Sequence, residues 1–184
     1  MVLADTLLCV NSIIGYFCNG ILVYCILATP NSRMGTYRYL ILVLAYFNIV
    51  YSTAHLLVIP VTYIRDFYVI FYSSSYLGQC GLVGYLALLA YCSLFAQSNM
   101  LLAFHFIYRY IYICRTELLQ FLNEPVMLLP VIVAYMFYTW LWIISVHLFM
   151  GSTPDFLGRV AADFHEFSGF WPNETAVVGN QYLD

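Results

Sequence analysis

The sequence has 184 residues, of which 64% are hydrophobic and only 8% are charged, and its formal net charge is -3. A soluble domain carries about 25% charged residues, because its surface must be solvated, so this composition excludes a soluble fold and indicates a surface that faces the lipid bilayer. Six basic residues are too few for the basic patch that a nucleic-acid partner requires.

Three uncharged runs are each long enough for one helix to cross the hydrocarbon core, which takes about 20 residues. The first covers residues 6–32, and it is far longer than the apolar core of a cleaved signal peptide. The second covers residues 39–64 and contains Pro60 near its end. The last covers residues 125–154, with an apolar core at 126–150. Each run predicts one membrane-spanning helix.

A further uncharged run, residues 67–108, is too long for one helix and barely long enough for two. Its segment 73–79 is rich in Ser and Gly, which is typical of a loop. We therefore expect an interfacial loop at 67–79 and one long, tilted helix at about 80–108. A hairpin of two short spans is the alternative.

The predicted fold is therefore an all-α integral membrane bundle of four transmembrane helices within residues 1–150. Residues 151–184 contain Pro, Gly and scattered acids, and we expect them to form an extracellular loop or tail. Cytoplasmic loops retain Arg and Lys, and the two loops on one side hold four arginines, Arg33, Arg38, Arg109 and Arg115, against Arg65 and Arg159 on the other. We therefore expect a multi-pass protein of the cell membrane whose N-terminus and tail are extracellular.

One sequon agrees with this orientation. Asn173-Glu174-Thr175 has the N-x-[ST] pattern, which is glycosylated only on the lumenal side of a membrane. Four spans with an outside N-terminus place Asn173 on that side. We therefore expect Asn173 to be the glycosylation site.

Polar residues within the spans are candidates for ligand contacts or for hydrogen bonds between helices. Asn48, Ser52 and His55 are spaced by four and three, so they share one face of the second span, which we expect to face the bundle. Gln97 and Asn99 are candidates on the third span. No acid or Arg lies at the centre of a span, which argues against a proton pump, an ion exchanger or a voltage sensor.

Catalytic and metal-binding patterns are not found in the sequence. The four histidines are scattered at different depths, and no pair of carboxylates lies within a span. The six cysteines show no C-x-x-C spacing, which favours a packing role. We therefore expect no enzyme activity, no metal and no cofactor.

The end of the third span carries the most informative segment, His105-Phe106-Ile107-Tyr108-Arg109-Tyr110. By itself, it fits an anchor whose Arg reaches out of the membrane. It also resembles the signature of nematode serpentine chemoreceptors of the Str class and of the related Srj and Srd classes. Residues 34–40, Met-Gly-Thr-Tyr-Arg-Tyr-Leu, resemble the segment that leads into the second span of those receptors. Segments 47–52 and 67–71 continue the pattern in order.

The resemblance implies a G-protein-coupled chemosensory receptor of the odorant type, which binds a small environmental molecule. His105, Tyr108, Arg109 and Tyr110 would then face a heterotrimeric G protein, and Asn173 would lie in the second extracellular loop. Rhodopsin-like receptors join the top of the third helix to that loop by a disulfide, and Cys80 is placed for one, but residues 151–184 contain no Cys.

Such receptors have seven spans, and this sequence predicts four. We therefore expect a truncated or fragmentary product that lacks spans five to seven. The alternatives are a self-sufficient four-span scaffold or channel subunit, and half of a small transporter.

Overall fold

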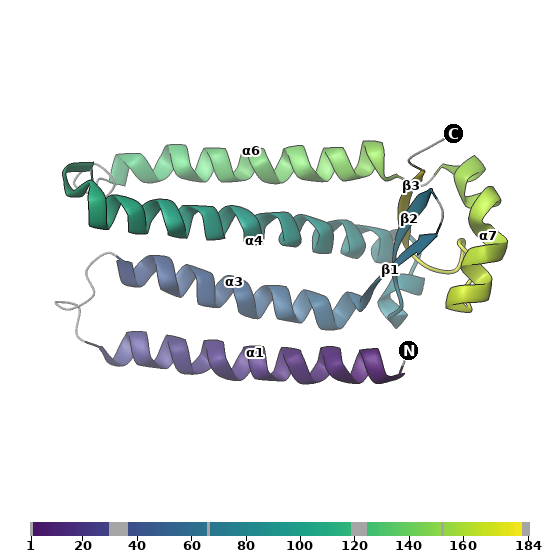
Figure 1. Ribbon diagram of the computed structural model, residues 1–184, viewed down its shortest axis with the longest axis horizontal. Helices are drawn as coiled ribbons and strands as arrows, with labels where there is room; N and C mark the ends of the chain where they lie inside the picture. Colours follow the sequence, from purple (N-terminus) through teal and green to yellow (C-terminus); the bar gives the residue numbers. More distant parts are fainter. Residues whose placement is uncertain (1, 30–36, 66, 119–124, 152, 182–184) are drawn as a thin grey trace.

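The computed structural model describes residues 2–29, 37–65, 67–118, 125–151 and 153–181. Within them, four long helices lie side by side in chain order (Figure 1): α1 (Val2–Ala28), α3 (Tyr37–Val58), α4 (Leu82–Cys114) and α6 (Pro125–Phe149). All four are long and apolar enough to cross a membrane. The predicted membrane bundle of four helices is confirmed.

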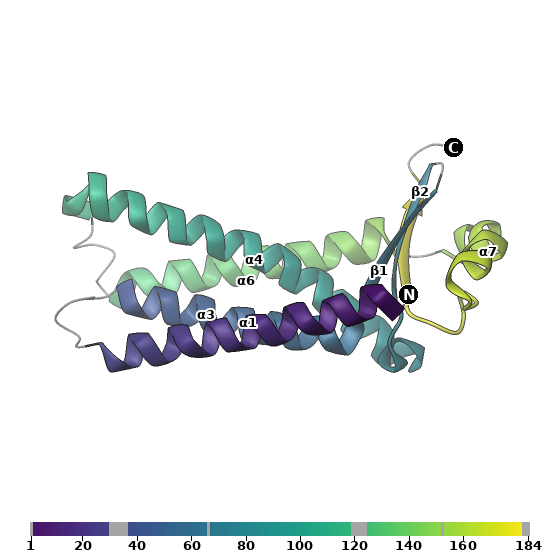
Figure 2. The ribbon, with the colours of Figure 1, turned by 60° about the horizontal axis from the view of Figure 1, so that its bottom comes forward.

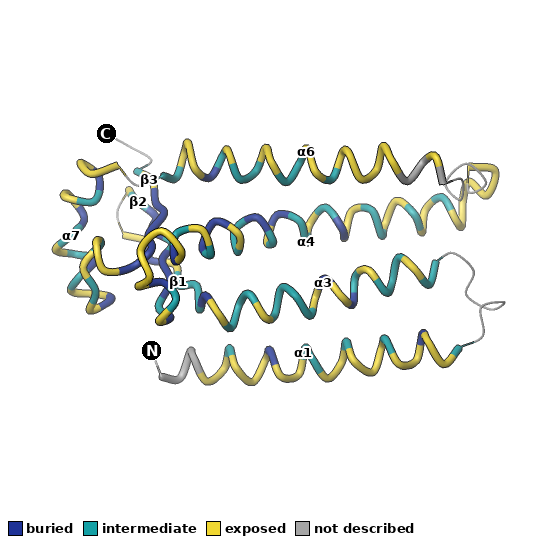
Figure 3. The backbone as a smooth tube through the Cα atoms, turned by 180° about the vertical axis from the view of Figure 1, so that it is seen from behind, coloured by how far each residue is buried: buried dark blue, intermediate teal, exposed yellow. Residues whose placement is uncertain are grey.

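Apolar side chains cover the outer surface of these helices. Figure 3 shows exposed residues along the whole length of the bundle, whereas buried residues gather at one end and in the adjoining turns of α4. Phe17 and Phe137, for example, are 69% and 68% exposed. A surface of this kind is stable in lipid rather than in water.

The second helix ends earlier than the sequence predicted. α3 ends at Val58, and residues 60–65, expected to continue the span to residue 64, form a strand instead. Ile59 has a positive φ of 44°, and it precedes Pro60, whose ring disfavours helical backbone at the residue before it. Pro60 is therefore the physical stop of the helix.

The third predicted span is a single helix. α4 runs without interruption over 33 residues, so the alternative of two short spans is wrong. A helix of this length extends about 50 Å, which exceeds the hydrocarbon thickness, and α4 is inclined to α1 (Figure 2). The expected interfacial loop at 67–79 is also wrong, because residues 68–73 form a strand and residues 76–79 a short 3-10 helix.

Three antiparallel strands form a sheet at one end of the bundle. β1 (Pro60–Arg65) pairs with β2 (Tyr68–Ser73), and β2 pairs with β3 (Val177–Gln181), so that the sheet order is β1-β2-β3. The register places Thr62 opposite Phe71 and Phe71 opposite Val178. The tail therefore adds β3 as a third strand to the β1–β2 hairpin, which lies more than a hundred residues earlier in the sequence.

The tail also contains a helix, α7 (Pro154–Ser168), where we had expected only a loop. Thr153 caps its first turn by accepting a hydrogen bond from the Phe156 amide, and Pro154 follows as a favoured first residue. Gly169 ends the helix in the left-handed conformation, with φ of 76°. Local sequence signals therefore fix both ends of this helix.

The sheet separates two apolar clusters, because successive residues of a strand point to opposite faces. Ile70, Tyr72 and Val177 pack against α7 through its buried residues Phe156, Val160 and Phe164. Phe71 and Val178 pack on the other side, against the end of the bundle, with Val58, Leu88 and Val146.

We call the sheet, the short 3-10 helix at Tyr76–Gln79 and α7 the cap, and the end of the bundle that they cover the capped end. α1 begins at the capped end (Figure 1). The opposite, uncapped end holds the start of α3 and the end of α4.

Candidate functional site

At the uncapped end, two residues of the predicted motif attach α4 to α3. The Tyr37 hydroxyl lies 3.3 Å from His105 Nε2, and the Tyr37 ring stacks on Tyr108 with 5.7 Å between the ring centroids. Tyr108 in turn stacks on Tyr112, one helical turn further on. His105 and Tyr108 are therefore structural contacts that hold the ends of the two helices together.

The other two residues of the motif lie on the surface. Arg109 is exposed, and Tyr110 is 56% exposed. Within the described ranges, Arg109 forms no ion pair. The structure therefore splits the predicted motif into an anchoring pair and an exposed pair, both at the uncapped end.

Asn48 and His55, two residues of the polar stripe on the second span, form hydrogen bonds to neighbouring helices. Asn48 Nδ2 donates a hydrogen bond to Asn19 Oδ1 of α1, with a distance of 3.3 Å. His55 Nδ1 lies 2.9 Å from the hydroxyl of Tyr91 on α4, and that hydroxyl lies 3.1 Å from the Tyr51 hydroxyl. Asn48 and His55 therefore join α3 to a different helix on each side.

The two candidates of the third span lie on different faces of α4. Gln97 donates to Ser93 Oγ at 2.9 Å and accepts a hydrogen bond from the Tyr135 hydroxyl of α6. Asn99 is exposed and donates a hydrogen bond to the Phe95 carbonyl of its own helix. The structure thus brings Gln97 into a helix contact and leaves Asn99 outside it.

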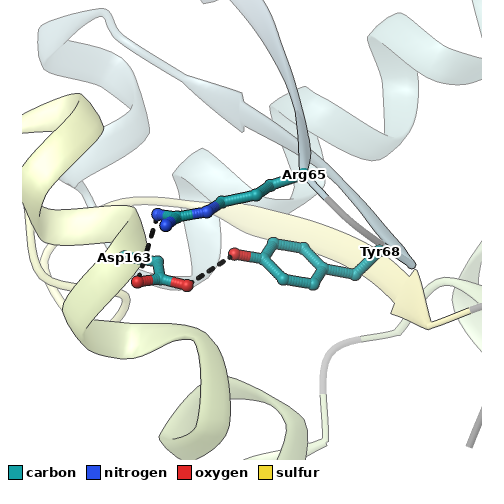
Figure 4. Close-up of polar contacts among 3 residues, drawn as sticks. All are labelled: Arg65, Tyr68 and Asp163. Carbon is teal, nitrogen blue, oxygen red and sulfur yellow. Dashed lines mark hydrogen bonds and ion pairs between the residues drawn. The ribbon is translucent and has the colours of Figure 1, made fainter.

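The cap contains a three-residue clamp that the sequence analysis missed. One carboxylate oxygen of Asp163 on α7 pairs with Arg65 at 3.2 Å, and the other accepts a hydrogen bond of 3.2 Å from the Tyr68 hydroxyl (Figure 4). Arg65 and Tyr68 flank the turn between β1 and β2. The clamp therefore fixes the tip of the hairpin against α7.

The same contacts shift two pKa values in the cap. A hydrogen bond with Tyr63 and the charge of Asp163 raise the pKa of the Arg65 guanidinium. Burial raises the pKa of the Tyr68 hydroxyl, and its hydrogen bonds with Tyr63 and Asp163 raise it further. Tyr68 therefore stays a neutral hydrogen-bond donor to a charged carboxylate.

Backbone hydrogen bonds join the tail to the segment that precedes α4, close in sequence to Cys80, the residue placed for a disulfide. The Ala176 amide donates to the Gly78 carbonyl at 2.8 Å, and the Ser73 amide donates to the Ala176 carbonyl at 3.2 Å. Cys80, beside them, is exposed and carries a free thiol. Backbone hydrogen bonds therefore attach the tail to this segment.

The sequon lies in a turn of the tail that belongs to the cap. Asn173 is exposed, and the Glu174 carboxylate accepts a hydrogen bond of 2.9 Å from the Trp171 amide. Thr175, the third residue of the sequon, is buried. Among the described residues, no group of His, Cys, Asp and Glu could hold a metal ion.

Comparison with known proteins gives a match over almost the whole chain. The model of the family "Serpentine type 7TM GPCR chemoreceptor Srj" matches residues 4–184. "Serpentine receptor class r-10" of Caenorhabditis elegans is 30% identical over 113 residues, which are 61% of this chain and 33% of that receptor. "Serpentine receptor class J-38" of the same organism is 31% identical over 110 residues, or 59% of this chain and 33% of the receptor.

The Caenorhabditis briggsae "Serpentine receptor class r-10" is 28% identical over 127 residues, covering 67% of this chain and 37% of the receptor. The matched part of the chain thus spans about a third of the length of these curated relatives. No solved structure matches this chain.

Proposed function

The chain belongs to the Srj family of serpentine seven-transmembrane chemoreceptors, and we propose that it acts as the first four spans of a G-protein-coupled chemosensory receptor for small environmental molecules. The family consists of receptors rather than enzymes. The observation that carries the proposal is that the motif at the uncapped end contains both anchoring and exposed residues. His105 and Tyr108 anchor α4 to α3, while Arg109 stays exposed beside them.

Arg109 is the residue that we assign to the G protein, with Tyr110 next to it. A guanidinium offers five donors in a planar fork, which suits carboxylates and backbone carbonyls of a partner. The anchoring contacts of its neighbours fix the helix end and so reduce the entropy lost when a partner binds.

We also propose that the uncapped end faces the cytoplasm and that the N-terminus, the cap and Asn173 are extracellular. Arg38, Arg109 and Arg115 lie at the uncapped end, which agrees with the rule that cytoplasmic loops retain positive charge. Of the four polar candidates in the spans, Asn99 is the one that we assign to the face toward further helices, because its side chain is exposed and its hydrogen bond stays within α4.

The test compares Arg109→Gln with Arg115→Gln in the complete product of the transcript, expressed in cells with a G-protein dissociation reporter. Losing a charged partner at an interface costs about 2–5 kcal/mol, so we expect Arg109→Gln to lower the response at least about tenfold. Arg115→Gln removes the same charge from the same helix end, and it should retain the response. Surface labelling of an N-terminal tag controls for expression. Equal signalling by both variants and the wild type would overturn the assignment.

A further inference from the structure

A closed turn in the tail places an exposed tryptophan next to the sequon. The Glu174 amide donates a hydrogen bond of 2.9 Å to the Trp171 carbonyl, and the Trp171 amide donates one of 2.9 Å to the Glu174 carboxylate. Pro172 and Asn173 are the central residues of this turn, and a proline is favoured at the first of these positions. The ends of a β-turn lie within about 7 Å of each other. Trp171 is therefore held close to Asn173.

The indole of Trp171 is held by a stacking contact. It stacks on the imidazole of His165 in α7, with 4.2 Å between the ring centroids and an angle of 9° between the ring planes. The stack covers one face of the indole, yet Trp171 remains 45% exposed. The exposed area therefore comes mainly from the opposite face and from the ring edges, which offer a flat apolar surface to a ligand.

This surface lies away from the lipid, although tryptophans of membrane proteins often serve as interfacial anchors. The stacking partner His165 belongs to α7, which lies on the side of the sheet opposite the four long helices (Figure 1). Asn173 is exposed in the same turn. A sugar linked to Asn173 would therefore lie in water, beside the open face of the indole.

We propose that Trp171 is the docking platform for the first N-acetylglucosamine of a glycan on Asn173. A pyranose ring has a face of C–H groups, and packing that face on an aromatic ring removes apolar area from water while the hydroxyls stay solvated. The turn and the stack on His165 already hold the indole, so docking requires little further ordering. The inference rests on the extracellular position of the cap under the proposed function, since a sequon is glycosylated only on that side.

The experiment uses the whole chain, produced in insect cells and placed in lipid nanodiscs. Labelling with ¹³C only in N-acetylglucosamine, followed by trimming with an endoglycosidase, leaves a single labelled sugar on Asn173. The ring current of an indole moves the signals of protons above its face upfield. We therefore expect C–H protons of this sugar to resonate upfield of their positions in the denatured chain.

Three variants test the platform, and a fourth is the control. Trp171→Leu retains an apolar side chain without an aromatic face, so the upfield shift should be lost. Trp171→Tyr retains an aromatic face and should keep part of the shift, which separates loss of the platform from loss of the fold. His165→Ala removes the stacking partner and should reduce the shift. Trp140→Leu, at a position of α6 that is 64% exposed, should change nothing.

Hydrogen exchange gives a second, independent measurement. The Glu174 amide is bonded to the Trp171 carbonyl, so its exchange rate reports the opening of the turn. Loss of the sugar in Asn173→Gln should speed this exchange about two- to tenfold when Trp171 is present, which is the usual effect of one aromatic contact. In a chain that also carries Trp171→Leu, Asn173→Gln should have no such effect.

A sugar on Asn173 whose protons keep their denatured positions, or whose upfield shift persists in Trp171→Leu, overturns the platform and leaves the proposed orientation standing. An Asn173 that never carries a glycan overturns both. An upfield shift that is lost in Trp171→Leu and partly retained in Trp171→Tyr supports the platform, and it does so whatever the G-protein response of Arg109→Gln.

Discussion

The Thr175 hydroxyl donates a hydrogen bond of 2.6 Å to the backbone carbonyl of Ser73, a residue 102 positions earlier in the chain. Thr175 is only 7% exposed, and it is also the third residue of the sequon at Asn173. One side chain thus contributes to the fold of the cap and is also part of the sequon that we propose for glycosylation at Asn173. Because the hydroxyl is buried in the folded cap, we expect glycosylation to precede the docking of the tail on β2.

Three variants separate the two roles of the sequon. Asn173→Gln should remove the glycan and leave the pairing of β3 unchanged, because Asn173 is exposed. Thr175→Val should remove the glycan and also destabilise the cap by about 1 kcal/mol, the usual net contribution of one hydrogen bond. Thr175→Ser retains both the sequon and the hydroxyl. Gel mobility with and without endoglycosidase reports the glycan, and hydrogen exchange in residues 177–181 reports the cap.

The same experiment tests the orientation. A wild-type chain that inserts in microsomes and never receives a glycan at Asn173, although a sequon engineered near Arg115 is modified, would reverse the proposed topology.

Phe164 on α7 is the centre of the cap's core, and a second prediction concerns it. Its side chain is fully buried and meets Tyr72 edge to face, with 5.0 Å between ring centroids. Phe164→Ala should destabilise the cap by about 3–5 kcal/mol, because it removes the transfer free energy of the ring and leaves a void. Hydrogen exchange along α7 measures the effect.

Phe167 supplies the matched control on the same helix. It is 50% exposed and stacks on Tyr63 at 4.3 Å, so Phe167→Ala should destabilise by only about 1 kcal/mol. Equal effects of the two substitutions would mean that α7 does not pack as described.

The four long helices could be predicted from the sequence because the thickness of the bilayer fixes the length of an apolar run. Helical spacing placed Asn48 and His55 on one face of α3, but it could not predict that Asn48 bonds to α1 and His55 to α4, because α3 packs against both of those helices. Pro60 was the available signal for the end of α3, but the uncharged residues after it continue the apolar run and concealed the strand.

The cap was predicted poorly, for two different reasons. β3 is only five residues long, and its pairing partner lies more than a hundred residues away, so nothing local distinguishes it from a loop. The pair of Arg65 and Asp163 is non-local in the same way. α7, in contrast, carries readable signals: the Thr153 cap, Gly169 at its end, and Phe156, Val160 and Phe164 at intervals of four. The prolines and glycines around it led to the loop interpretation.

Tyr91 connects α3 and α4 inside the bundle, and a third prediction concerns its hydroxyl, which lies within hydrogen-bonding distance of both His55 and Tyr51. Tyr91→Phe should destabilise the helix contact by about 0.6–1.7 kcal/mol, the range found for such bonds between membrane helices. Unfolding in mixed micelles with increasing SDS measures the effect. Tyr46→Phe, at a lipid-facing position of α3, is the control, and an equal loss in both variants would contradict the structure.

Tyr68 gives the cap a dependence on alkaline pH. The folded cap raises the pKa of its hydroxyl above the ordinary value of about 10, chiefly by burial and then by its hydrogen bonds with Tyr63 and Asp163. Folding therefore favours the neutral form, so this contribution to stability is fully present below about pH 10 and is lost as the pH rises further.

We expect the cap's thermal midpoint, followed by near-UV circular dichroism, to fall above pH 10 in the wild type. The fall should be smaller in Tyr68→Phe, which has no proton to lose, and unchanged in Tyr76→Phe, whose side chain is 84% exposed. A wild-type curve that matches that of Tyr68→Phe would show that the Tyr68 hydroxyl is not buried against Asp163.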